Sequence, residues 1–323
     1  MQRFTRTERF LSLFTYLRPG EGRAAMLLCV QSFIIMLAYY LLKVIREPMI
    51  LAEGSAELKA YSNSVQAVLL IFIVPLFAHL YRGASSRAGK HHLLHDTLLF
   101  FLFNLIGFGL AWRQGWPVGI LFYIWLGIFS VMVLALFWAF AADLFNLKSG
   151  QRIFPLIAAA SALGALLGSG IASPLDLALG HDGVMYCAAM LLLIPLWLSR
   201  LVERDIPGES RSLKADPASS EPSPLSAGFR LVLRSRYLGL IAGFVILLNL
   251  INTNGEYVLA TFVTGSADLP VDALSGGLRG EDYITRFYSQ YLFLTTLIGF
   301  LIQLLLVARI FKYMGIHGAL LIL

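Results

Sequence analysis

AAMLLCVQSFIIMLAYYLLKVIREPMILA, residues 24–52, is the stretch that decides what kind of fold this chain adopts. Only two of its first 19 residues fall outside the hydrophobic class, and about 20 apolar residues cross a bilayer as one helix. Lys43, Arg46 and Glu47 follow at once, before the apolar pattern resumes. Because a Lys or Arg near the bilayer centre costs roughly 2.5–3.5 kcal/mol, such residues usually face a cavity and mark a solute pathway. The stretch therefore predicts a membrane-spanning helix with charged side chains at a cavity.

The composition of the whole chain supports a membrane protein. Hydrophobic residues make up 58% of the 323 positions and charged residues 14%, whereas soluble domains carry about 25% charged residues. We expect an all-α integral membrane protein with eight complete spans and part of a ninth, which begins near residue 315 and continues beyond residue 323. The eight apolar runs are 24–42, 60–81, 94–111, 118–145, 153–175, 183–201, 237–263 and 288–310.

The distribution of positive charge predicts the orientation. With a cytoplasmic N-terminus, 19 of the 25 Lys and Arg residues fall on cytoplasmic segments, as the positive-inside rule requires. This bias explains the net charge of +6 without any nucleic-acid partner. Lys43 and Arg46 are two of the six exceptions, which favours a functional reason for their position.

The chain divides into two unequal parts around a polar segment. Residues 202–236 include PASSEPSP (217–224) and are too rich in Pro, Ser and charge to bury a core, so we expect a cytoplasmic linker. It separates a six-span half (24–201), preceded by a cytoplasmic segment (1–23), from an incomplete second half (237–323). This is the layout of a two-half transporter. The alternative is an ordinary loop in a single bundle.

Lys43, Arg46 and Glu47 have the spacing of one helical face. Two cations on that face suit a phosphate or a carboxylate, because Arg offers a planar fork of donors and Lys a point charge. Glu47 would hold these cations when no ligand is bound. The alternative is a self-compensating cluster that reaches the headgroups by snorkelling.

A second polar cluster lies in the seventh run, within LLNLINTNGEY (247–257). Three asparagines, a glycine and a carboxylate predict a locally broken helix that lines a cavity. Asn252 and Glu256 share a face, and Glu256 would be the counter-charge to Lys43 or Arg46. A helix-capping role for the cluster is the alternative.

Two further patterns concern the six-span half. Asp143 ends the fourth run, and we expect it to pair with Arg152 as a gate or anchor at the cytoplasmic mouth. Ala160, Gly164 and Gly168 recur every four residues, which predicts close packing of the fifth span on a neighbouring helix.

No motif indicates an enzyme or a bound cofactor. The chain has no phosphate-binding P-loop, no HExxH and no nucleophile elbow. His91, His92 and His95 gather in one segment, but no carboxylate or Cys accompanies them at ligand spacing. We predict neither catalysis nor a metal site.

At these same residues the chain resembles the bacterial branch of the ATP:ADP antiporter family. The resemblance implies a major-facilitator-like bundle of twelve spans in the bacterial inner membrane. The stretches that carry it are YYLLKVIREPMIL (39–51), GSAELKAYS (54–62), FWAFAADLFNLKSGQRIFPLIAAASALGA (137–165), LLNLINTNGEYVLA (247–260) and RIFKYMGIHGALLIL (309–323).

The resemblance also implies nucleotide exchange by alternating access, with substrate-binding charges at Lys43 and Glu256. A further acid of the family would fall near Leu126, where this chain has none, and a further Lys would fall beyond Leu323. We therefore expect a secondary transporter of nucleotides or of a related phosphorylated anion. The alternatives are a proton-coupled symporter of another organic anion, in which Glu256 titrates, and a membrane scaffold protein without transport activity.

Overall fold

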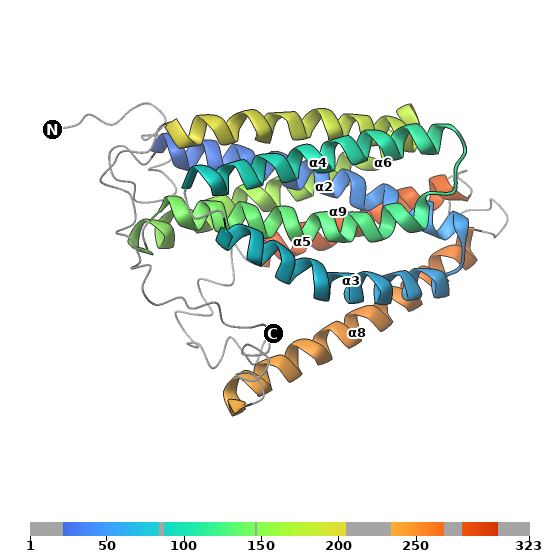
Figure 1. Ribbon diagram of the computed structural model, residues 1–323. Coiled ribbons are helices and arrows are strands. Elements are labelled where there is room, and N and C mark those ends of the chain that lie inside the picture. The colour runs from blue at the N-terminus through green and yellow to red at the C-terminus, as the bar shows by residue number, and fades with distance from the viewer. Residues whose placement is uncertain (1–21, 84–86, 146, 205–233, 268–279, 303–323) are drawn as a thin grey trace.

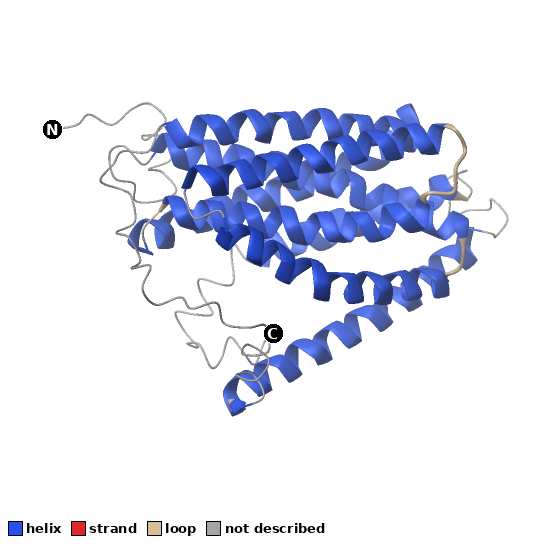
Figure 2. Cartoon of the chain, in the orientation of Figure 1, coloured by secondary structure: helices blue, strands red, loops and turns tan. Residues whose placement is uncertain are grey.

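The computed structural model describes residues 22–83, 87–145, 147–204, 234–267 and 280–302. In these ranges the chain forms helices joined by short loops and contains no strand, in agreement with the predicted all-α class (Figure 2). The helices are α2 (Gly22–Glu53), α3 (Ala56–Gly83), α4 (Arg87–Arg113), α5 (Gly119–Leu144), α6 (Leu147–Arg204), α8 (Arg236–Ala267) and α9 (Glu281–Ile302).

Six of the described helices are long and apolar enough to cross a membrane: α2, α3, α4, α5, α6 and α8. The fifth and sixth predicted spans both fall within α6. The eighth coincides with α9 as far as Ile302, and the ninth lies outside the described residues. The greater part of the predicted linker, 205–233, also lies outside them.

α6 is two helices joined at a sharp bend. Gly180 has φ 74° and ψ 170°, a conformation that is open to glycine and strained for other residues. On α2, Gln31 donates to the carbonyl of Pro195 and Ser32 to that of Ile157. These carbonyls would be about 57 Å apart along a straight helix, so the chain must fold back at Gly180 for neighbouring residues to reach both.

α2 occupies the centre of the bundle, where it packs against α3, α5, α6 and α9 (Figure 1). Its contact with α6 depends on glycine. A Cβ at Gly164 would collide with the carbonyl oxygen of Phe33, and one at Gly168 would lie 2.6 Å from that of Leu37. The predicted packing role of the small-residue stripe is therefore confirmed.

One end of the bundle is closed by apolar contacts between segments that are far apart in the sequence. We call this the closed end: it includes the end of α2, the start of α3, α5 and α9, and the end of α8. α3 and α8 meet there and diverge towards the opposite end (Figure 1). The buried residues of the cluster are Ile50, Leu51, Ala56, Tyr123, Ala260, Val263, Ile284 and Tyr288.

Candidate functional site

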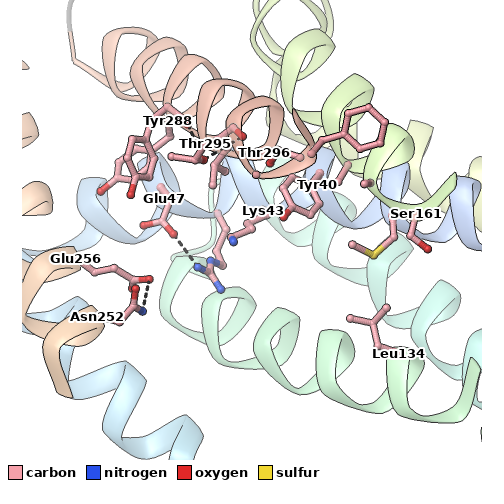
Figure 3. Close-up of a pocket in the computed structure, with 18 of the residues that line it drawn as sticks. Tyr40, Lys43, Glu47, Leu134, Ser161, Asn252, Glu256, Tyr288, Thr295 and Thr296 are labelled. Carbon is pink, nitrogen blue, oxygen red and sulfur yellow. Dashed lines mark hydrogen bonds and ion pairs between the residues drawn. The ribbon is translucent and has the colours of Figure 1, made fainter. Parts of the chain in front are cut away.

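A cavity of about 630 Å³ lies between α2, α3, α5, α6, α8 and α9. Four residues that the sequence singled out for solute binding line it together (Figure 3). They are Lys43, Arg46, Asn252 and Glu256. Glu47, predicted to hold the cations, lines it as well. The two polar clusters, about 200 residues apart in the chain, thus face one space.

A buried ion-pair triad forms one wall of the cavity. Glu47 Oε1 lies 2.7 Å from Arg46 Nη2, and Glu47 Oε2 lies 2.6 Å from Lys59 Nζ. The exposed fractions are 9% for Arg46 and 3% for both Glu47 and Lys59. Such burial inside the bundle is not the arrangement that snorkelling predicts. Two cations share one carboxylate, so the triad keeps one positive charge at the cavity.

Aromatic rings hold the cations of this wall. The Arg46 guanidinium lies 4.2 Å from the centre of the Tyr123 ring, and Lys59 Nζ lies 5.3 Å from that of Tyr288. The Tyr123 hydroxyl in turn donates to Asn63 Oδ1 at 2.8 Å. Desolvated cation–π contacts stabilise a charge by about 2 kcal/mol without neutralising it. The cations are therefore fixed in place while their positive field still reaches the cavity.

Two donors at the cavity remain without a partner among the described residues. Arg46 Nε and the Tyr288 hydroxyl are both buried, and neither has a hydrogen-bond partner there. A buried donor without an acceptor costs roughly 1–3 kcal/mol. Both residues line the cavity. Both atoms are themselves covered, so a ligand in the cavity would reach them only after neighbouring side chains move.

Lys43 stands apart from the triad. It is half-buried, and its Nζ lies 5.3 Å from the centre of the Tyr40 ring on the preceding turn of α2. Within the described part of the chain no carboxylate lies in ion-pair range of this ammonium group. It lines the cavity, as Figure 3 shows. Lys43 is therefore the most available cation for an incoming anion.

Glu256 lies on α8, on another wall of the cavity, with Asn252 one turn before it. Asn252 Nδ2 donates to Glu256 Oε1 at 3.2 Å (Figure 3). Within the described ranges Glu256 forms no ion pair with Lys43 or Arg46. The partner of Arg46 is Glu47 instead.

The predicted break in this helix is wrong, because α8 runs without interruption from Arg236 to Ala267. Asn249 and Asn254 donate their amides to the carbonyls of Val245 and Leu250, four residues back in the same helix. Their polar groups are thus satisfied locally, and no backbone has to unwind to reach them. Gly255 does not have positive φ.

Asp143 and Arg152 are not among the described residues that line the cavity. Asp143 is the penultimate residue of α5, and Arg152 lies in the second turn of α6. Arg152 Nη2 donates to Ser149 Oγ at 3.4 Å. Their pairing as a gate remains a prediction.

Lys59 is the site residue that sequence reasoning missed. It comes from the first turns of α3, and only the packing of α3 beside α2 brings it to Glu47. A signal was nevertheless present, because Lys59 is one of the six cations that break the predicted charge bias. By contrast, Leu126 is fully buried in the core, so the position expected for a further acid does not face the cavity.

Comparisons with protein-family models, with curated proteins and with solved structures found no match.

Proposed function

We propose that this protein is a secondary membrane transporter that binds a nucleotide or a related phosphorylated anion in the cavity and exchanges it by alternating access. The observation that carries the proposal is the charge of the cavity wall. Arg46 and Lys59 share the single carboxylate Glu47 on that wall. Lys43 lines the same cavity outside this triad, and Glu256 lines it from α8. In a medium of low dielectric constant, uncompensated cations attract an anion strongly.

The size and the remaining walls of the cavity agree with a nucleotide. Small-molecule sites usually measure about 300–1,000 Å³, and this cavity has about 630 Å³. Aromatic residues from three helices, including Tyr40, Trp138 and Tyr291, line it. Aromatic faces stack on nucleobases with about 1–3 kcal/mol per base. The charged wall would take the phosphates and the aromatic walls the base.

Alternating access requires two halves that separate at one end at a time. The cavity lies between the helices of residues 22–204 and those of residues 234–302, and apolar contacts join these two groups at the closed end. This arrangement supports transport over the scaffold alternative, because a scaffold needs no charged internal cavity. A proton-coupled symporter is the second candidate function, because Glu256 is a half-buried carboxylate that would carry the coupled proton.

The experiment is exchange of labelled ADP or ATP by proteoliposomes that contain the purified full-length protein. Saturable exchange is the expected result, with orthophosphate and citrate as competing anions to define the solute class. Lys43→Ala should weaken binding about 10–100-fold, the loss of one hydrogen bond to a charged group. Arg236→Ala is the matched control, since it removes an exposed cation at the start of α8 and should change nothing.

Undiminished exchange by Lys43→Ala would contradict the role of that residue. Absence of saturable binding of any phosphorylated anion would contradict the function and favour the scaffold. Uptake of a different anion that stops when the proton gradient is collapsed, and that Glu256→Gln abolishes, would favour the symporter.

A further inference from the structure

A second group of titratable side chains lies at the closed end, outside the cavity. His181 follows the bend of α6 directly, and its Nδ1 lies 2.6 Å from Asp176 Oδ1 on the same helix. Its Nε2 lies 3.6 Å from Glu281 Oε2 in the first turn of α9. His181 is 7% exposed and Asp176 5%. We call Asp176, His181 and Glu281 the histidine cluster.

The two protonation states of His181 differ in what they can bind. A neutral imidazole has one N–H, and donation to Asp176 leaves the lone pair of Nε2 directed towards the carboxylate of Glu281. The structure agrees with this geometry, since Nε2 is buried and has no hydrogen-bond partner within the described residues. An imidazolium donates from both nitrogens and can bind both carboxylates.

The indole of Trp112, in the last turn of α4, adds a further contact. It stacks on the imidazole with ring centres 5.4 Å apart and an interplanar angle of 29°. An aromatic face attracts a cation more strongly than a neutral ring. Protonation of His181 therefore strengthens three contacts at once: those with Asp176, Glu281 and Trp112.

Other charged groups at the closed end contribute to the electric field at His181. The carboxylate of Glu53, at the end of α2, is held by the backbone N–H groups of Gly119 and Ile120, at 2.6 and 3.0 Å. Within the described residues, further charged groups lie on the elements that carry the cluster and its stacking partner: Arg113 on α4, Asp182 on α6, and Asp282 and Arg286 on α9.

The position of the cluster gives protonation a mechanical consequence. Asp176 and His181 belong to the first group of helices, Glu281 to the second, and Glu281 lies one turn before Ile284 of the apolar contacts at the closed end. We propose that His181 is a proton-binding site whose protonation binds α6 to α9 and stabilises the closed end. This inference does not depend on which solute the cavity takes.

The test measures separation of the closed end as a function of pH in the full-length protein in lipid nanodiscs. The native Cys29 and Cys187 are first changed to Ser. Spin labels then replace two exposed residues, Gln114 directly after α4 and Gly265 near the end of α8, so that each group of helices carries one label. Distances are measured at about pH 5.5 and about pH 8, which bracket the usual titration of His. The ratio of short to long distances should be roughly tenfold higher at the lower pH, the effect of one charge-assisted hydrogen bond.

His181→Gln and Glu281→Gln should each remove this pH dependence. The Glu281 side chain is 48% exposed, so Glu281→Gln should leave the core intact. If His181→Gln does not fold, the pH dependence of Glu281→Gln still tests the proposal. His95→Gln is the matched control, because His95 also lies beside an aspartate, with 3.4 Å from Nδ1 to Asp96 Oδ1, but far from the closed end on α4. The inference is overturned if the wild-type ratio is the same at both pH values, if pH dependence survives in Glu281→Gln, or if His95→Gln removes it too.

Discussion

α2 and α8 have the same length of 32 residues, and each carries polar groups in the middle of an apolar sequence. α2 is surrounded by other helices, and its Glu47 binds a cation from α3. α8 is mostly exposed, and its amides bind carbonyls or a carboxylate of α8 itself. The comparison teaches that the neighbours of a membrane helix decide whether its polar residues build a site between helices or are satisfied within their own turn.

The largest test of this contrast removes one carboxylate from each helix. Glu47→Gln leaves Arg46 and Lys59 buried without their shared counter-charge, which should lower the free energy of unfolding by about 3–5 kcal/mol. Glu256→Gln makes the same chemical change on α8 and should cost under about 1 kcal/mol. Thermal unfolding of the purified protein in one detergent measures both. Equal losses of unfolding free energy would show that the triad is no more important to the fold than the pair of Asn252 and Glu256 on α8.

The next largest loss of stability is expected from substitution of a glycine at the contact between α2 and α6. Gly164→Ala places a methyl group against the carbonyl oxygen of Phe33, so the helices must separate. Overpacking of this kind costs about 1–3 kcal/mol. The same thermal unfolding assay applies, and a variant as stable as the wild type would contradict the close approach.

Substitution of a glycine on α8 should instead raise the stability of the protein. A Cβ at Gly255 meets nothing within 4 Å, and the residue lies inside a regular helix. Gly255→Ala should therefore stabilise the protein by about 0.5–1 kcal/mol through helix propensity alone. A lower unfolding temperature would mean that another segment packs against this face of α8.

The smallest effect concerns the local pair on α8. Asn252→Ala removes the hydrogen bond to Glu256, and pairs at this spacing stabilise a helix by about 0.2–0.5 kcal/mol. Unfolding should hardly change. Since Asn252 lines the cavity, solute affinity is the more sensitive measurement, and Asn249→Ala on the same helix is its control. A large loss of stability in Asn252→Ala would contradict the local character of this pair.

The sequence predicted the helical class, the charged face of α2 and the glycine contact, because each depends on periodicity or composition within one segment. The sequence also predicted that Lys43 and Glu256 face one cavity, because each lies in the first span of its half of the chain. Lys59 was missed because its partner depends on how α3 packs beside α2. The break predicted for α8 was wrong because hydrogen bonds from Asn side chains to their own helix compete with unwinding.

Three contacts join α2 to α5 near the closed end. Glu53 binds two N–H groups at the start of α5, and a Cβ at Gly119 would collide with the carbonyl oxygen of Met49. Arg46 also lies on the Tyr123 ring of α5. If the protein works by the proposed alternating access, these three contacts should make α2 and α5 move together. The two helices would then separate from α8 and α9 at the apolar contacts of the closed end, near the contact of Lys59 with the Tyr288 ring.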